Sequence, residues 1–327
     1  MANGQTSIYA LGLVILATLA AIPFIAGPYA LFFCGQMLCL GYIAASLQLS
    51  FAYARVLSFA QGMFFATAAY VACTLHNAGY GMLVTLAGAV LAAGAFGLLV
   101  GLLVMRMKGA HTAVIGTLLV ASILLMSANT FVDITGGEDG LSLKGPTHLF
   151  GLTIPLGTNL ATYFAAFIPF GGYLVFTAFA ERTTFGLVLK AAGSNEARAR
   201  QLGYDVQRRH LVVFGVAAGI SGYGGAISAL MLQHISSSLF DPAMSLTAVL
   251  WATVGGLRMP LGALFGTVAI FPLTELASRL FNSVEAVVGL LLIVIAIAFP
   301  QGIVGALDRR SLPAMGLTGR LRAMLNL

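Results

Sequence analysis

Apolar runs long enough to cross a lipid bilayer alternate with short polar intervals along most of the chain. A helix needs about 20 apolar residues to cross the hydrocarbon layer. The pattern therefore predicts spans at 8–26, 29–50, 57–75, 81–105, 112–132, 159–180, 210–232, 247–257, 261–280 and 285–300. The run 247–257 is too short to cross alone, so we expect either a half-helix or a tilted short span that its neighbours cover.

The composition favours a membrane protein. Of the 327 residues, 59% are hydrophobic and 8% are charged, whereas soluble domains carry about 25% charged residues. We expect an all-α integral membrane protein, with about ten transmembrane or half-membrane helices packed tightly in one transmembrane domain over 1–327. The first run lacks a charged region before it, which favours a retained helix over a cleaved signal.

Small residues recur four positions apart in several runs. In lipid such pairs let helix backbones approach closely, so tight packing is predicted at Gly97/Gly101, Gly215/Gly219, Ala218/Gly222, Ser221/Gly225 and Gly262/Gly266. The three cysteines lie in apolar runs without the spacing of a metal or disulfide site, and we expect them to be packing residues. An inverted repeat of two halves fits the number of elements, although the halves share no convincing identity.

The basic residues predict the orientation. With the interval 183–209 in the cytoplasm, 14 of the 16 Lys and Arg residues fall inside, and only Lys144 and Arg279 fall outside. An excess of basic residues in cytoplasmic loops is the usual orientation signal, so both termini are predicted to be cytoplasmic. The same asymmetry accounts for the net charge of +6 without a nucleic-acid partner.

Two polar intervals are large enough to carry function. In 183–209, charged residues follow helical spacing between Gly193 and Gly203, which leaves two readings: a solvated loop, or short amphipathic helices outside the membrane. The interval 133–158 is rich in Gly and Pro turn signals and is predicted to be an extracytoplasmic loop. Its acidic residues are Asp133, Glu138 and Asp139.

Several chemistries are excluded by inspection. None of the three lysines is preceded by glycine, so the chain has no GxxxxGK[ST] phosphate loop. The lack of HExxH and of any recognisable Ser/His/Asp set argues against a membrane-embedded enzyme. Deep intramembrane carboxylates, which ion-driven carriers usually need, are also missing. We therefore expect no metal site and no cofactor in this chain, and the energy for any transport would come from a partner.

Residues in 183–209 and in the following run carry a family resemblance. They are Phe185-Gly186-x-x-Leu189-Lys190-Ala191, Asn195-Glu196-x-Arg198-Ala199, Leu202-Gly203-Tyr204-Asp205 and Gly215 to Ala226. This pattern resembles the LivM-type permeases of branched-chain amino acid ABC importers. Further similar segments, in the family's order, are Leu57-Ser58-Phe59, Arg106-x-Lys108-Gly109, Thr135 to Leu141, Val254 to Leu257 and Phe299 to Gly302.

The resemblance implies a permease subunit of an ATP-driven importer in the bacterial inner membrane. The implied partners are a homologous second permease, two ABC ATPase subunits that bind ATP and Mg, and an extracytoplasmic substrate-binding protein. Interval 183–209 would then be a coupling loop that moves with the ATPases and switches the packed helices between discrete states. The implied contact and turn residues are Phe185, Gly186, Leu189, Ala191, Asn195, Glu196, Arg198 and Gly203.

The substrate path is predicted from polar residues inside the spans. Such residues are more often interhelical hydrogen-bonding groups than substrate contacts. Gln61, Thr117 and Ser221 rank above the others because they lie in segments with the resemblance. Because the spans hold almost no charge, we expect selectivity to reside in the binding protein, docked around Asp133, Glu138, Asp139, Lys144 and Arg279.

The substrate itself is left open by departures from the family pattern, above all the one near Gln61, which could line the path. The chain has Ala60-Gln61 where the family usually has Gly-His. Branched-chain amino acids are the implied substrates. The alternatives are urea, short amides or aromatic acids carried by the same class of importer, and a stand-alone ion-coupled carrier is a further reading.

Overall fold

The computed structural model describes residues 3–25, 27–54, 58–107, 110–149, 152–180, 183, 186, 199, 201–203, 205–257, 261–280, 289 and 302. Its long helices are α1 (Asn3–Ile25), α2 (Pro28–Ala54), α3 (Gln61–Asn77), α4 (Met82–Arg106), α5 (Ala110–Thr130), α7 (Leu160–Ala180), α10 (Val206–Leu232), α11 (Pro242–Gly255) and α12 (Gly262–Leu280). The short elements are α6 (Val132–Thr135), η1 (Ser237–Phe240), β1 (Leu141–Ser142), β2 (Thr147–Leu149), β3 (Leu152–Ile154) and β4 (His234–Ile235).

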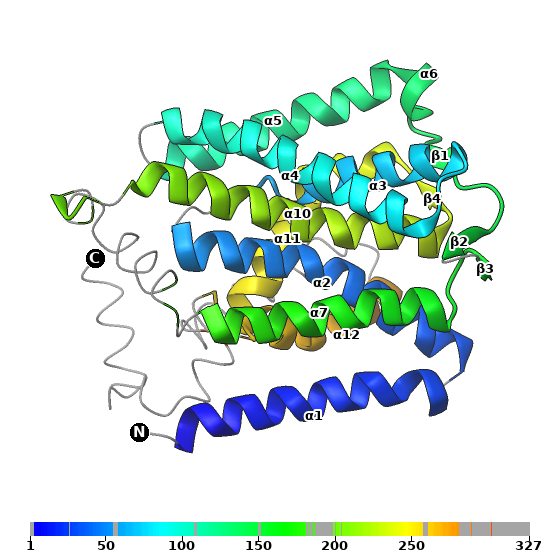
Figure 1. Cartoon of the computed structure of the whole chain (residues 1–327), viewed down its shortest axis with the longest axis horizontal. Coiled ribbons are helices and arrows are strands. Elements are labelled where there is room, and N and C mark those ends of the chain that lie inside the picture. Colours follow the sequence, from blue (N-terminus) through cyan, green and yellow to red (C-terminus); the bar gives the residue numbers. More distant parts are fainter. Residues whose placement is uncertain are drawn as a thin grey trace.

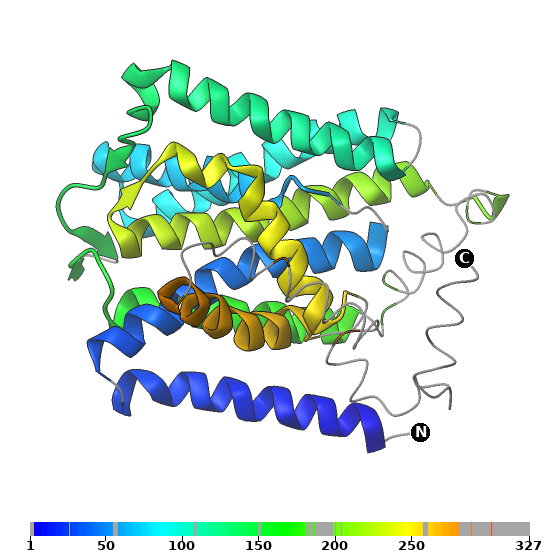
Figure 2. The ribbon, with the colours of Figure 1, turned by 180° about the vertical axis from the view of Figure 1, so that it is seen from behind.

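Most of the long helices run side by side along one direction, with α1 and α5 at opposite edges (Figures 1 and 2). Helix α10 lies in the middle and makes its main contacts with α4, α3 and α2. Helix α11 is the exception, since it crosses the bundle diagonally in the reverse view of Figure 2. The arrangement places α10 and α2 in the interior, and α5 is the most exposed of the five helices that are long and apolar enough to span a membrane.

Five helices are long and apolar enough to cross a membrane by length and composition. They are Pro28–Tyr53, Met82–Val104, Thr112–Thr130, Leu160–Thr177 and Gln207–Leu232. Shorter apolar helices are Ala10–Ile25, Pro242–Gly255 and Gly262–Ala277. The prediction of a helical, multi-pass membrane protein is confirmed for the described residues. The predicted run 285–300 lies outside them, apart from residue 289, and the side of the termini stays a prediction.

Small residues bring the central helices into backbone contact, as predicted. Gly97 of α4 lies against Ala218 of α10 so closely that an added Cβ atom would overlap with its methyl group. A Cβ atom at Gly225 of α10 would overlap with the carbonyl oxygen of Phe65 on α3. Since backbone carbonyls cannot move aside like flexible side chains, α10 must keep glycine at this position.

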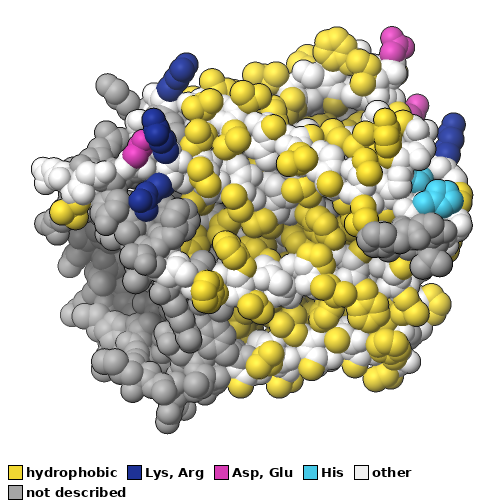
Figure 3. Space-filling model, viewed as in Figure 1, with side chains coloured by type: hydrophobic (Ala, Val, Ile, Leu, Met, Phe, Trp, Pro, Cys, Tyr) yellow, Lys and Arg dark blue, Asp and Glu magenta, His cyan; other side chains and the backbone are white. Residues whose placement is uncertain are grey.

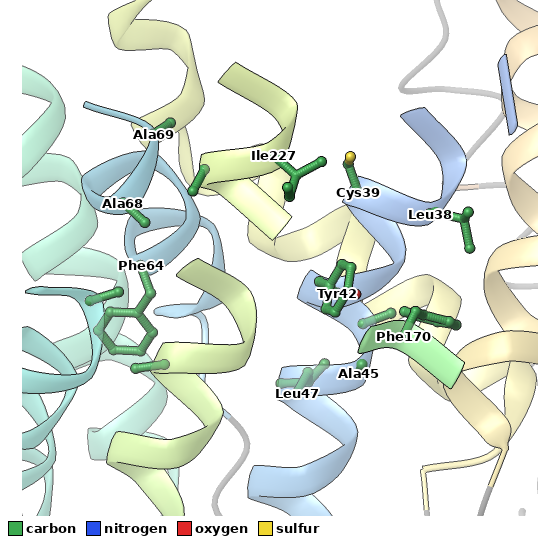
Figure 4. Packing of buried hydrophobic residues seen from close by; sticks show 14 of the residues in the cluster. Leu38, Cys39, Tyr42, Ala45, Leu47, Phe64, Ala68, Ala69, Phe170 and Ile227 are labelled. Atoms are coloured by element: carbon green, nitrogen blue, oxygen red, sulfur yellow. The ribbon is translucent and has the colours of Figure 1, made fainter. Parts of the chain in front are cut away.

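The core also contains aromatic side chains that bond to the backbone of a neighbouring helix. Tyr42 of α2 is 2% exposed, and its hydroxyl donates to the carbonyl oxygen of Ala166 on α7 at 2.7 Å. Its ring packs edge-on against Phe170, with ring centroids 5.1 Å apart (Figure 4). Buried tyrosines need such a partner for their hydroxyl. This bond joins α7 to the interior helix α2.

Helix α3 begins later than the predicted span 57–75. Residues Ser58, Phe59 and Ala60 are buried but not helical, and the helix starts at Gln61. The predicted start is wrong because the residues before Gln61 are mostly apolar and continue the hydrophobic pattern without a gap. At 1.5 Å per residue, the 17 residues of α3 extend about 26 Å, less than the roughly 30 Å hydrocarbon layer.

The expected short helix near 247–257 is confirmed as α11, and it starts earlier, at Pro242. Its 14 residues extend about 21 Å, too little to cross the hydrocarbon layer alone. The carboxylate of Asp241 accepts a hydrogen bond from the Ala243 backbone N–H at 2.8 Å. An N-cap aspartate followed by proline is a strong helix start signal, which hydropathy alone does not detect.

The predicted loop 133–158 is more ordered than its turn signals suggested. It contains α6 and three short strands, of which β1 pairs with β4 after α10 and β2 pairs with β3. Asn77, at the end of α3, donates to the carbonyl oxygen of Ser142 at 3.1 Å and accepts from the Lys144 backbone N–H at 3.0 Å. The loop is therefore fixed to the ends of α3 and α10.

Candidate functional site

The non-helical residues before α3 leave backbone groups that need partners in the interior. The Phe59 N–H donates to the hydroxyl of Thr117 on α5 at 3.1 Å. The Gly62 N–H donates to the hydroxyl of Ser245 on α11 at 3.0 Å. Irregular backbone at membrane depth is tolerated only where protein or water satisfies it. Here hydroxyl groups from two other helices provide the hydrogen-bond acceptors.

Gln61 joins two further helices at the same place. Its side-chain carbonyl accepts from the hydroxyl of Ser46 at 2.5 Å, and its side-chain nitrogen donates to the hydroxyl of Ser50 at 3.3 Å. Its backbone carbonyl accepts from the hydroxyl of Ser221 on α10 at 2.7 Å. The α3 polar cluster is defined here as Ser46, Ser50, Gln61, Thr117, Ser221 and Ser245, and each of them is at most 2% exposed.

The cluster lies near the middle of the bundle. Ser221 is 15 residues from the start of α10 at Val206 and 11 residues from its end at Leu232. Helix α3 therefore starts at mid-length, and α11 meets it there through Ser245. The hydrogen bonds link α2, α3, α5, α10 and α11. A movement of α5 or α11 relative to α3 would therefore break these bonds unless the bonded residues of α3 moved with it.

A second irregular segment, between α11 and α12, is bonded to the same part of α2. The side-chain oxygen of Gln48 accepts from the Ala263 backbone N–H at the start of α12, at 3.0 Å. Gly256 has a φ of 114°, a backbone conformation that residues other than glycine rarely adopt. An added Cβ at Gly255 would overlap with the Gly262 carbonyl oxygen. Glycine therefore allows this turn and the close crossing of α11 and α12.

The structure brings together all three residues predicted for the substrate path. Thr117 bonds to the backbone of Phe59, and Ser221 bonds to the backbone of Gln61. Sequence reasoning missed Ser46, Ser50 and Ser245. Ser46 and Ser50 are four residues apart and so share one face of α2, a signal that was present. Ser245 had no such signal, because its partner is 183 residues away.

The residues predicted for coupling to an ATPase are only partly described. Gly203 lies in a turn with a φ of +83°, which fits the predicted turn position. Gly186 is helical, and its N–H donates to the Thr183 hydroxyl at 3.3 Å. Six predicted residues lie outside the described residues: Phe185, Leu189, Ala191, Asn195, Glu196 and Arg198.

The predicted docking residues gather at the end of the bundle that carries α6 and the strands. Asp133, Glu138, Asp139 and Lys144 are exposed there, and Figure 3 shows acidic and basic side chains at this end. Arg279 belongs to α12, but its side chain lies outside the described part. An open groove of about 620 Å³ lies between the α1–α2 turn and the start of α7, and none of the predicted site residues lines it.

The family of the chain follows from comparison with known proteins. A family profile described as the permease component of branched-chain amino acid transport systems matches residues 29–298. The chain belongs to this family of membrane permeases. The matched range includes the α3 polar cluster, the irregular segment between α11 and α12, and the loop 183–209. The resemblance to LivM-type permeases that the sequence motifs predicted is confirmed.

The similar curated proteins are permeases of ABC or amino acid transport systems. The high-affinity branched-chain amino acid transport system permease proteins LivM of Salmonella typhimurium and Escherichia coli are 28% and 27% identical, each over 74% of this chain and 62% of the relative. The L-arabinose ABC transporter permease protein AraH of Azospirillum brasilense is 28% identical over 54% of this chain and 48% of the relative. The chain thus spans about half to three-fifths of their length. No solved structure matches it.

Proposed function

We propose that this chain is the permease subunit of an ATP-driven importer for branched-chain amino acids. The family match over residues 29–298 carries the proposal, and the two LivM relatives support branched-chain amino acids as the substrate class. The buried α3 polar cluster supports it physically, since irregular backbone and short helices at membrane depth are typical of transporter interiors. The chain would act in the bacterial inner membrane as a multi-pass subunit.

The partners follow from the class of transporter. A homologous second permease would complete the substrate path, two ABC ATPases would bind ATP and Mg, and an extracytoplasmic protein would bind the substrate. The coupling loop 183–209 would contact the ATPases through Phe185, Leu189, Ala191, Asn195, Glu196 and Arg198, with a turn at Gly203. Gly186, also predicted as a turn position, is helical. Acidic and basic residues of the opposite end, with Arg279, would receive the binding protein.

Gln61, Thr117 and Ser221 would border the path rather than hold the substrate tightly. Their polar groups already bond within the α3 polar cluster, so a passing amino acid would meet a mildly polar surface. Weak contacts suit a path that must release its substrate. We therefore place selectivity in the binding protein.

A sugar is the second candidate substrate, because the AraH relative is described as an L-arabinose permease. The two candidates are separated by competition in vesicles that contain the complete complex. We expect unlabelled leucine, isoleucine and valine to compete with labelled leucine, and L-arabinose and urea not to compete. Uptake of L-arabinose without uptake of leucine would leave the ABC mechanism standing and show that the proposed substrate is wrong.

A further inference from the structure

The last two residues of α3 hold the backbone of Lys144 at the end of the bundle that carries the strands (Figure 1). The Lys144 N–H donates to the side-chain oxygen of Asn77 at 3.0 Å, and the Lys144 carbonyl oxygen lies 3.1 Å from Nε2 of His76. Because a carbonyl oxygen can only accept, Nε2 of His76 is the donor. The amide nitrogen of Asn77 also donates to the carbonyl oxygen of Ser142 at 3.1 Å. Both polar groups of the Lys144 backbone are thus bonded to α3.

The same segment is bonded on its other edge to the residues that follow α10. Strand β1 pairs with β4 in antiparallel register. The Leu143 N–H donates to the carbonyl oxygen of Gln233, the C-cap residue of α10, at 2.9 Å. The 141–144 clamp is defined here as Leu141, Ser142, Leu143 and Lys144. The clamp therefore joins the end of α3 to the end of α10.

Helices α3 and α10 are joined a second time at the α3 polar cluster. There the hydroxyl of Ser221 on α10 donates to the Gln61 carbonyl oxygen at 2.7 Å. Between the two junctions the backbones are in contact, since a Cβ atom at Gly225 would overlap with the Phe65 carbonyl oxygen. Asn77 is 16 residues beyond Gln61 in α3, a length of about 24 Å. Rigid elements and hydrogen-bond networks of this kind carry energetic coupling between distant sites.

Charged side chains surround the clamp and face solvent. Lys144 is exposed, and so are Glu138 and Asp139 in the turn before β1. Gly140, which follows them, lies so close to the Ile235 carbonyl oxygen that an added Cβ atom would overlap with it. The charges are therefore carried by backbone that is fixed to β4 and to the end of α3. A protein that docks on these charges would act directly on both helices.

We propose that the 141–144 clamp transmits docking of the substrate-loaded binding protein to the α3 polar cluster, and that Asn77 is the positioning residue that joins the clamp to α3. This proposal rests on the proposed function, which places the binding protein at this end of the chain. A shift of the clamp would move α3, and the hydrogen bonds at the start of α3 would pass the shift to α5 and α11. A loop that is merely tied down would give no such response.

The test is ATP turnover by the complete complex, measured over a series of concentrations of leucine-loaded binding protein. Each titration gives the maximal stimulation and the concentration for half of it. Asn77→Ala removes both amide hydrogen bonds, and the loss of one neutral hydrogen bond changes an equilibrium constant by about fivefold. We expect maximal stimulation to fall by about fivefold or more. The half-stimulating concentration should stay close to the natural value, because β4 and His76 still hold the docking residues.

The matched control is Asn159→Ala at the same end of the bundle. Asn159 donates to the Pro155 carbonyl oxygen at 2.6 Å and accepts from the Thr162 N–H at 3.0 Å, so it also forms two bonds to backbone, but to residues beside it in the chain. This variant should keep the natural stimulation. Asn77→Asp keeps the acceptor for the Lys144 N–H and loses the donor to Ser142, so its stimulation should lie between those of the natural chain and Asn77→Ala.

Three results would overturn the proposal, and they differ in what they leave standing. Equal maximal stimulation in Asn77→Ala and Asn159→Ala would show that Asn77 transmits nothing. A higher half-stimulating concentration with unchanged maximal stimulation would show that Asn77 only shapes the docking surface. In both cases the proposed function would stand. If the loaded binding protein failed to stimulate the natural complex, the proposed function would be wrong and the role of the clamp would fall with it.

Discussion

The substitution Ser245→Ala tests whether the α3 polar cluster holds the helices together. The hydroxyl of Ser245 on α11 accepts from the Gly62 N–H at 3.0 Å, and Ser245 is 2% exposed. Alanine removes the acceptor and leaves the buried Gly62 N–H group without another hydrogen-bond acceptor among the described residues. The change is small in volume, so its effect reports on the hydrogen bond rather than on packing.

The expected loss of stability follows from two magnitudes. Interhelical hydrogen bonds in membrane proteins average about 0.6 kcal/mol and reach about 1.7 kcal/mol. A buried donor left without a partner costs about 1–3 kcal/mol. Because the N–H lies at the start of α3 and cannot turn to another acceptor without moving the helix, we expect a loss of about 1–2 kcal/mol.

The matched control is Ser122→Ala on α5. Ser122 is exposed, and within the described part of the chain its hydroxyl donates to the carbonyl oxygen of Leu118, one turn earlier in the same helix. The assay is the unfolding midpoint of the purified protein in mixed micelles, with both variants measured at the same detergent composition. If Ser245→Ala unfolds at the same midpoint as Ser122→Ala, the cluster does not link α11 to α3 energetically.

Two further predictions follow from the packing and from the proposed coupling. Gly225→Val should prevent stable folding, because its Cβ would overlap with the Phe65 carbonyl oxygen. Gly172→Ala has open space around it and should change stability by less than about 1 kcal/mol. The membrane yield and the unfolding midpoint of the two variants test this difference. Glu196→Arg should leave the protein inserted but reduce ATP-driven uptake at least tenfold, as measured in vesicles, and normal uptake with normal recovery of ATPase subunits would refute the role of loop 183–209.

The helical fold was predictable because a membrane span requires a continuous apolar run. For the same reason the start of α3 was not: the residues just before Gln61 are apolar, so hydropathy gives no sign that the helix starts later. What fixes that start is tertiary, namely the hydroxyls of Thr117 and Ser245 on distant helices. The choice of Gln61, Thr117 and Ser221 came from motif resemblance, and the structure adds that they meet at one place.

The start of α11 illustrates a local signal that was overlooked. Asp241 and Pro242 form an N-cap and first-turn pair, which sequence reading can detect when helix caps are weighed beside hydropathy. The crossing of α11 and α12 is different. Glycines at 255 and 262 were visible in the sequence, but the contact of Gly255 with the Gly262 carbonyl depends on a turn geometry that spacing does not specify.

Uptake in reconstituted vesicles tests the central claim most directly. The chain is incorporated with its second permease and ATPase subunits, ATP and Mg are enclosed, and the binding protein and labelled leucine are added outside. We predict leucine accumulation that requires ATP and the binding protein, and none by this chain alone. Leucine accumulation by this chain alone, without ATP, would contradict the account and identify a stand-alone carrier.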